Sequence, residues 1–206
     1  MFNTKEKKER SLGAKLFLKP TRCLSPKCVT IRRPQRPGVH SNPRRSVSEF
    51  GQQLLEKQRF QFSYGLREAQ MRRLFKDALK NPAVTGDVFM SLLERRLDNA
   101  VFRVGIAPSR SVARQLVSHG HIMVNGRRVS IPSYRVAVGD AITIRPQSAT
   151  HSAFKDLKER LMQYAPPSWL SVNPEKAEGT VSALPKDFDI PFDVNMVVDY
   201  YSKVVK

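Results

Sequence analysis

Apolar side chains recur at helical spacing in three stretches of the first half of the chain. Ser46 and Glu49 have the spacing of a capping box and predict a helix over 46–59. A second apolar stripe predicts a helix over 66–80, because an Asn-Pro pair follows it directly. A third stripe predicts one long helix over 85–105, which a glycine would end as C-cap.

Beyond the third helix the pattern shortens and then changes its period. A short helix is predicted over 109–118, since its first residue is a serine suited to cap it. Asn125-Gly126 then separates two short runs of alternating apolar residues. This pair predicts a hairpin with a type I′ turn, because both turn residues need a positive φ. Further short strands are predicted over 134–138 and 142–145.

The two flanks of the chain differ in pattern. Residues 20–45 hold five prolines among their arginines, so we predict an extended arm without helix or regular strand there. Residues 153–164 are apolar at helical spacing and predict a helix that returns the chain to the first domain. Trp169 is expected to be a core residue rather than a stacking platform.

Together these elements predict an α+β fold. Its expected parts are a basic extended arm (1–45), a mainly helical domain (46–90, completed by 153–206), an inserted module of two helices and a small antiparallel sheet (91–152), and a C-terminal helix and tail (153–206).

The charge of the chain indicates its kind of partner. The sequence has 36 Lys and Arg against 18 Asp and Glu, a net charge of +18. The excess falls in two blocks: residues 1–50 carry 13 basic and 3 acidic side chains, and residues 101–150 carry 7 and 1. Two phosphate-facing surfaces are therefore predicted, and an arm so rich in arginine is expected to become ordered on nucleic acid. A general solubilising charge is the alternative.

Other function classes fit the sequence poorly. It shows no Ser/His/Asp or Cys/His arrangement, no glycine-rich phosphate loop and no HExxH motif, so an enzyme is not expected. Its apolar stretches are too short for a membrane span, and its charged start does not have the pattern of a secretory signal. A protein of an internal compartment, without membrane attachment, is expected.

The predicted module carries the most specific candidate residues for binding RNA. We expect its arginines to share one outward-facing surface on the helices and hairpin, where guanidinium groups can grip phosphate and small polar groups can reach sugars. The candidates are Arg96, Asn99, Arg103, Ser109, Arg110, Arg114, His119, Asn125, Arg127 and Arg128. Two alternatives stay open: Arg95 or Arg96 pairs within the protein with Glu94 or Asp98, and His119 only caps a helix.

Several motifs carry a family resemblance. The segments Arg96–Asn99, Ser109–Val117, His119–Ile122 and Val124–Arg127 resemble the helix–helix–hairpin RNA-binding module named after ribosomal protein S-four. The arm around Cys23–Cys28 and Arg32–Pro34, the run Gln70–Phe75, and the tail motifs Pro167–Leu170 and Tyr200–Lys203 resemble the small-subunit ribosomal protein family itself. The resemblance covers nearly the whole chain, so a shared module alone does not explain it.

The resemblance implies a structural ribosomal protein. It implies direct binding to small-subunit ribosomal RNA, in which Arg32, Arg33 and Arg36 of the arm take part, and nucleation of subunit assembly. It also implies a place at the messenger-RNA entry channel, carried here by Arg44 and Arg45, beside ribosomal proteins three and five, and an influence on decoding accuracy. The expected location is the cytoplasmic or an organellar ribosome. The alternative is a free RNA chaperone or RNA-modification factor with the same module.

The cysteines raise the question of a metal. Some members of this family bind zinc through four N-terminal cysteines, of which only the pair Cys23 and Cys28 is present here. The positions of the other pair fall on Glu6 and Glu9. Structural zinc sites normally use Cys and His, so two reduced thiols without a cofactor are expected, and a zinc site with two carboxylates is the alternative.

Overall fold

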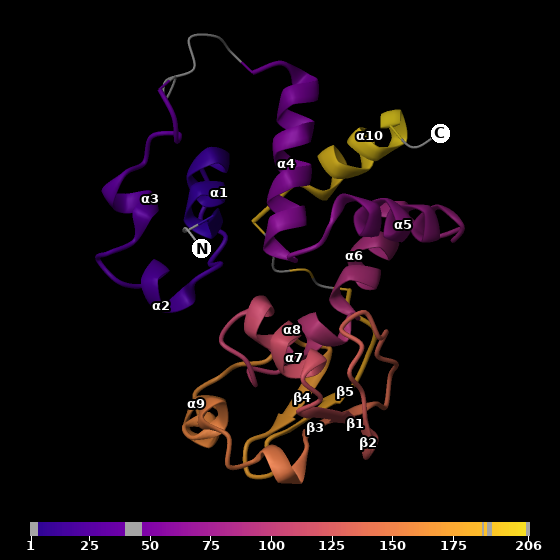
Figure 1. The fold of residues 1–206 in the computed structure, drawn as a ribbon. Coiled ribbons are helices and arrows are strands. Elements are labelled where there is room, and N and C mark those ends of the chain that lie inside the picture. Colours follow the sequence, from indigo (N-terminus) through magenta and orange to yellow (C-terminus); the bar gives the residue numbers. More distant parts are fainter. Residues whose placement is uncertain (1–3, 40–46, 187, 189–190, 205–206) are drawn as a thin grey trace. The chain divides into compact units, whose positions relative to one another are not determined.

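The computed structural model describes residues 4–39, 47–186, 188 and 191–204. The chain divides into two compact units, residues 1–86 with 190–206 (unit 1) and residues 87–189 (unit 2). The helices in order are α1 (Thr4–Leu12), α2 (Pro20–Cys23), α3 (Val29–Arg32), α4 (Glu49–Ser63), α5 (Glu68–Leu79), α6 (Thr85–Glu94), α7 (Leu97–Arg103), α8 (Arg110–Ser118), α9 (Leu157–Met162) and α10 (Val194–Val204), as labelled in Figure 1. The strands are β1 (Ile122–Val124), β2 (Arg127–Arg128), β3 (Ala141–Ile144), β4 (Leu170–Asn173) and β5 (Glu178–Val181). This mixture of helices and one small sheet confirms the predicted α+β class.

In unit 1 the C-terminal helix α10 packs beside α4. The rings of Phe75 and Tyr201 lie 5.1 Å apart, and those of Phe60 and Phe192 lie 5.5 Å apart. Burial raises the pKa of the Tyr201 hydroxyl, and the adjacent Glu68 carboxylate raises it further. The tail thus completes the helical core of unit 1 from the far end of the sequence.

The N-terminal region differs from its prediction. The segment predicted as an arm without helix contains α2 and α3, each of four residues. Proline does not prevent this, because Pro20 stands at the first position of α2, where its missing N–H would have no helical partner anyway. Helix α4 begins at Glu49, and its cap is Ser48, whose Oγ accepts from the Gly51 amide at 3.3 Å. The predicted cap, Ser46, lies outside the described residues.

The long third helix predicted over 85–105 is two helices. Arg96 has extended backbone angles (φ −68°, ψ 137°) and separates α6 from α7. The first amides of α7 find their acceptors far along the chain: Leu97 N donates to Tyr134 O at 2.8 Å, and Asp98 N donates to Pro132 O at 3.2 Å. The strand predicted over 134–138 is therefore a loop that contributes one bridge to Arg96, through Arg135.

Unit 2 is built around a five-stranded antiparallel sheet with the order β2-β1-β3-β5-β4. Asn125 and Gly126, with φ of 50° and 75°, form the predicted turn between β1 and β2. The sequence analysis did not predict β4 and β5. They extend the sheet of the module, because β5 pairs with β3 and β4 pairs with β5. Trp169 beside β4 is buried in the core of unit 2, 2% exposed, as expected.

The C-terminal segment is shared between the units. Helix α9 stays on unit 2, because Arg160 donates to Ile106 O at 3.1 Å and Tyr164 donates to Arg103 O at 3.0 Å. Phe154, Leu157 and Leu161 belong to the same apolar core as α7 and α8. Residues 153–189 therefore lie in unit 2, and only the residues from 190 onward join unit 1, whereas the sequence analysis assigned all of 153–206 to the helical domain.

Candidate nucleic-acid interface

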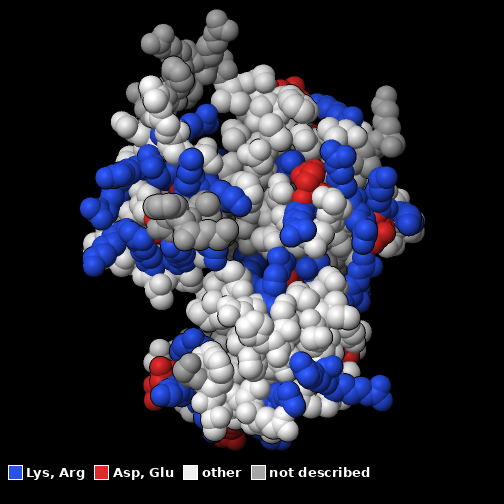
Figure 2. Space-filling view, in the orientation of Figure 1, with Lys and Arg blue, Asp and Glu red and all other residues white. Residues whose placement is uncertain are grey.

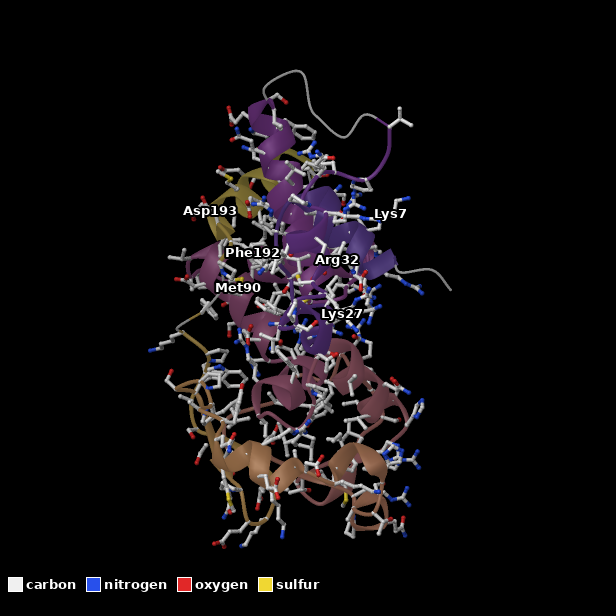
Figure 3. All side chains as sticks on the ribbon, turned by 90° about the vertical axis from the view of Figure 1, so that its left-hand side faces the viewer. Lys7, Lys27, Arg32, Met90, Phe192 and Asp193 are labelled. Atoms are coloured by element: carbon white, nitrogen blue, oxygen red, sulfur yellow. The ribbon has the colours of Figure 1, made fainter. Side chains whose placement is uncertain are left out.

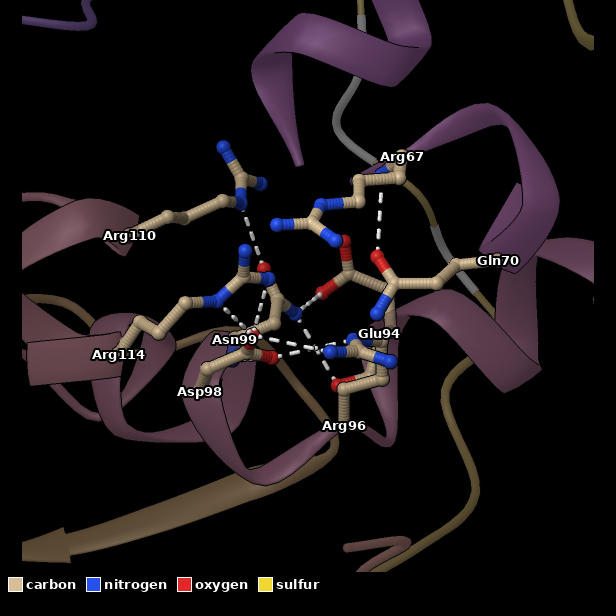
Figure 4. Close-up of polar contacts among 8 residues, drawn as sticks. All are labelled: Arg67, Gln70, Glu94, Arg96, Asp98, Asn99, Arg110 and Arg114. Carbon is tan, nitrogen blue, oxygen red and sulfur yellow. Dashed lines mark hydrogen bonds and ion pairs between the residues drawn. The ribbon is translucent and has the colours of Figure 1, made fainter. Parts of the chain in front are cut away.

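A buried polar network joins α6, α7 and α8 (Figure 4). The Asp98 carboxylate, 3% exposed, accepts from Arg96 Nε at 3.2 Å and from Arg96 Nη2 at 3.1 Å. It also accepts from Arg114 Nε at 2.9 Å and from Arg114 Nη2 at 2.5 Å. One buried carboxylate thus fixes two guanidinium groups from consecutive elements, which is a strong charge-assisted arrangement.

A second buried carboxylate, Glu94, acts in the same way. Arg103 donates to it through Nε at 3.0 Å and through Nη2 at 3.1 Å. The Asn99 amide nitrogen donates to Glu94 Oε2 at 2.8 Å, while the Asn99 amide oxygen accepts from Arg110 Nε at 2.7 Å. The guanidinium of Arg110 also lies over the Phe102 ring, 4.8 Å from its centroid. Glu94 and Asn99 therefore tie α8 to α6 and α7.

The expectation of one outward-facing surface is wrong for several candidates. Arg96, Asn99 and Ser109 are buried, at 5%, 2% and 7% exposed. Arg96 pairs inside the protein with Asp98, as the alternative foresaw, and the Ser109 hydroxyl caps α8 by accepting from Val112 N at 3.3 Å. A buried charge or hydroxyl is costly unless it has a hydrogen-bond partner, and these three side chains have their partners within the module. They therefore hold the module together.

Three arginines of the helices are intermediate. The side chains of Arg103 and Arg114 are 16% and 33% exposed, and that of Arg110 is half-buried. Each is anchored by the network and keeps part of its side chain accessible to solvent. Such an anchored group loses little side-chain entropy when it meets a phosphate.

The hairpin carries the exposed candidates of unit 2. Arg127 and Arg128 form β2 at the edge of the sheet, and both are exposed. Asn125 is also exposed, but its side chain closes the turn: it donates to Asp140 Oδ1 at 2.8 Å and accepts from Ala141 N at 2.9 Å. His119 is the C-cap residue of α8, and it is exposed. Its capping position therefore does not exclude contact with RNA.

Unit 1 has a basic surface of its own. Lys and Arg side chains gather over α1, α2 and α3 in Figure 2, and Figure 3 shows Lys7, Arg32 and Lys27 one below another along this part of the chain. Arg32 and Arg33 are exposed and Arg36 is half-buried, which suits the role predicted for them. Arg44 and Arg45 lie outside the described residues.

The individual RNA-binding candidates cover only part of this basic surface. They leave out the lysines of residues 5–27, although the charge count over residues 1–50 includes them and the run Lys5 to Arg10 is visible in the sequence. Helix α1 turns this run into a folded basic face, and Arg10 holds the chain after α3 by donating to Arg33 O at 3.0 Å and to Gln35 O at 3.1 Å.

The four residues considered for zinc do not fit a metal site. Glu9, 2% exposed, accepts from Leu16 N at 3.2 Å and from Leu18 N at 3.1 Å, and the Cys23 thiol points at the same carboxylate at 3.8 Å. Burial raises the pKa of Cys23, and so does the charge of Glu9. The Glu9 carboxylate is therefore already engaged by two amides and the thiol, and carboxylates are not the usual ligands of a structural zinc site.

The other two candidate ligands are also engaged elsewhere. Glu6 Oε1 pairs with Arg22 at 2.9 Å and with Lys19 at 3.6 Å. Cys28 Sγ lies 3.0 Å from Thr30 Oγ1, and this hydrogen bond is the main reason why the pKa of Cys28 is lowered. Among residues 4–39, 47–186, 188 and 191–204, no group of three or more His, Cys, Asp or Glu side chains is placed to hold a metal ion.

None of the helices in the described part of the chain has the length and apolar character required to cross a membrane.

Comparison with known proteins covers both units. Residues 2–94 match the family model described as ribosomal protein S4/S9 N-terminal domain, and residues 95–142 match the S4 domain. The small ribosomal subunit protein uS4 of Halothermothrix orenii is 49% identical to this chain over 196 residues, 94% of each chain. The uS4 proteins of Gloeobacter violaceus and Pelotomaculum thermopropionicum are 50% and 47% identical, again over 94% of each chain.

Proposed function

Because the chain belongs to the uS4 family of small-subunit ribosomal proteins, we propose that it is a structural constituent of the small ribosomal subunit and binds small-subunit ribosomal RNA directly. The family predicted from the sequence motifs is confirmed, and its members are ribosomal proteins rather than enzymes. The observation that carries the proposal is that each unit has its own basic surface: the face of α1 to α3 in unit 1, and the hairpin arginines in unit 2.

The two surfaces contribute in different ways. Exposed Lys and Arg groups release counterions from the RNA when they neutralise phosphates, which gives affinity without sequence preference. The anchored arginines Arg103, Arg110 and Arg114 present guanidinium groups in fixed positions on α7 and α8. A fixed set of groups selects a folded RNA whose phosphates match it, and this is how proteins recognise RNA shape.

The proposal extends to the place of the protein in the subunit. A rigid module that binds ribosomal RNA early would organise a helical junction and so nucleate assembly of that domain. Arg44 and Arg45 are proposed to face the messenger-RNA entry channel, beside ribosomal proteins three and five, and to influence decoding accuracy. Reversal of both charges should slow the unwinding of structured messenger RNA by the subunit, and unchanged unwinding would contradict this part of the proposal.

Sedimentation through a high-salt wash tests the central proposal. A constituent of the subunit co-migrates with it in a one-to-one ratio after the wash, because its contacts are many and partly buried. A free RNA chaperone or modification factor, the alternative with the same module, would be released or found at a lower ratio. Release of the chain would therefore contradict the proposal, whether on the cytoplasmic or an organellar ribosome.

A further inference from the structure

Three of the four histidines of the chain converge on one part of unit 2. His119 follows α8, His121 immediately precedes β1, and His151 lies between β3 and α9. The ring centroids of His119 and His121 are 6.0 Å apart, and those of His121 and His151 are 5.1 Å apart. Segments about thirty residues apart in the sequence thus bring three imidazoles together, a feature that the sequence analysis did not predict.

Two of the imidazoles are held in place by neighbouring groups. His121 Nδ1 shares a hydrogen bond with Ser148 Oγ at 2.9 Å, and His151 Nδ1 accepts from Ala153 N at 3.2 Å. The Phe154 ring, 7% exposed, lies 6.4 Å from the His121 ring and 6.1 Å from the His151 ring. His119 and His151 are exposed, so the cluster lies at the surface.

Among the described residues, the charged groups that shift the pKa of His121 are basic. Burial lowers the pKa of His121, and the neighbouring His151, His119, Arg145 and Arg128 lower it further by repulsion. Arg128 packs its guanidinium against Gly120, in the space that a side chain there would need. The surroundings of His121 therefore disfavour its protonated state as long as no negative charge approaches.

We propose that His119, His121 and His151, with Arg128 and Arg145, form a proton-linked site for the phosphodiester backbone of RNA. The proposal rests on the proposed function for the identity of the anion. A phosphate placed among these groups stabilises the imidazolium forms and raises their pKa values. The imidazoles therefore take up protons when the phosphate binds. The two guanidinium groups favour an anion over a metal cation, which they would repel.

Binding and protonation then strengthen each other, because linkage is reciprocal. As pH falls from about 8 to about 6, more imidazoles carry a charge, and the affinity for RNA should rise. A shift of about one pKa unit on binding corresponds to up to about tenfold in affinity for each histidine. We expect a rise of roughly three- to tenfold for the cluster, since its members repel one another.

The test measures the affinity of the full chain for a small-subunit ribosomal RNA transcript at about pH 8 and about pH 6, at fixed ionic strength. Binding at the higher pH, where an ordinary imidazole is neutral, tests the proposed function, and the ratio of the two affinities tests this inference. Calorimetry in two buffers of different ionisation enthalpy counts the protons taken up. Inorganic phosphate, titrated alone, shows whether the site binds a phosphate outside an RNA backbone.

Three variants decide the outcome. The double variant H119Q/H151Q should lose most of the rise in affinity between about pH 8 and about pH 6. H151K should keep a positive charge and bind more tightly at the higher pH. H40Q removes the fourth histidine and should keep the full pH dependence. An unchanged affinity ratio in H119Q/H151Q, or loss of the ratio in H40Q, would overturn the proposal.

Discussion

Arginines play opposite parts in the α7–α8 region and in the N-terminal region of residues 4–39. In α7 and α8 the buried carboxylates Glu94 and Asp98 take up the guanidinium groups, so positive charge serves to hold the elements together. In the N-terminal region the buried Glu9 accepts from backbone amides instead. Glu6 pairs with Arg22 and Lys19, but their side chains stay 42% and 36% exposed, and basic side chains gather at the surface. The difference teaches that the place of the acidic groups decides which basic residues remain for RNA.

The two arrangements also differ in what they fix. The network of α7 and α8 sets the orientation of a few guanidinium groups, which suits recognition of a shape. The N-terminal region instead offers many cations of long, flexible side chains, which suits affinity through counterion release. A change at Asp98 should therefore affect unit 2, and a change at Glu9 should affect unit 1.

The largest effect is expected for Asp98→Ala. It leaves Arg96 buried without its carboxylate and removes the ion pair of Arg114 with Asp98, and removing one partner of a buried pair typically costs about 3–5 kcal/mol. Urea unfolding followed by tryptophan fluorescence measures this, because Trp169 lies in the core of unit 2. The control is Glu159→Ala, an exposed carboxylate of α9, which should change the free energy of unfolding by less than about 0.5 kcal/mol. Equal effects of the two variants would disprove a structural role for Asp98.

A smaller and more local effect is expected for Glu9→Ala. Two amides, of Leu16 and Leu18, lose their acceptor, which should cost about 2–4 kcal/mol in the N-terminal region. Hydrogen exchange should show faster exchange over residues 4–39 and unchanged exchange in unit 2. The matched control is Glu49→Ala, whose side chain is 81% exposed.

The same region allows a test of metal dependence. Because Glu9 holds this part of the chain through hydrogen bonds, treatment with a chelator should leave its hydrogen exchange and the melting temperature unchanged. A stoichiometric zinc in the purified chain, together with a lower melting temperature after chelation, would show that the hydrogen bonds are not sufficient.

Local signals in the sequence predicted much of unit 2. The Asn125-Gly126 turn and the Ser109 cap are determined by neighbouring residues, and both are where the pattern placed them. The break at Arg96 could not be predicted, because the acceptors of the next two amides, Leu97 N and Asp98 N, come from residues 132–134. For the same reason β4 and β5 were missed: these short segments become strands only by pairing along the sheet, β5 with β3 and β4 with β5.

The candidate site was predicted less well than the fold. Residue type and spacing identified the arginines, but whether each is buried depends on Glu94 and Asp98, which the sequence analysis treated as one alternative for Arg95 and Arg96 only. Arg96 and Arg127 have the same side chain, and only the folded chain shows that one is 5% exposed and the other lies on an exposed edge strand.

The exposed Arg127 and Arg128 and the buried Arg96 should differ most clearly in RNA affinity and its salt dependence. Replacing both by alanine should weaken RNA binding about ten- to thirtyfold and lower the slope of log affinity against log salt by up to about two units, with unchanged stability. Arg96→Ala should do the reverse, lowering stability and leaving the slope unchanged, because its guanidinium is buried. Arg110→Ala and Arg114→Ala, at half-buried positions, should each lower the slope by up to about one unit. A loss of slope in Arg96→Ala would mean that this residue reaches the RNA.

The smallest expected effect is the response of the free protein to acid. The pKa of His121 is lowered in the folded chain, so the unfolded chain binds more protons and the free energy of unfolding should fall as pH drops below about 6.5. The loss should be on the order of 1 kcal/mol or less, and smaller still in H119Q/H151Q, because two of the repelling imidazoles are then gone. Thermal unfolding of the free chain between about pH 8 and about pH 5.5 measures it. With RNA bound, the free energy of unfolding should instead rise as pH falls, because a phosphate among the imidazoles favours their protonated forms. The N-terminal region has no described histidine, so its stability should show no such reversal.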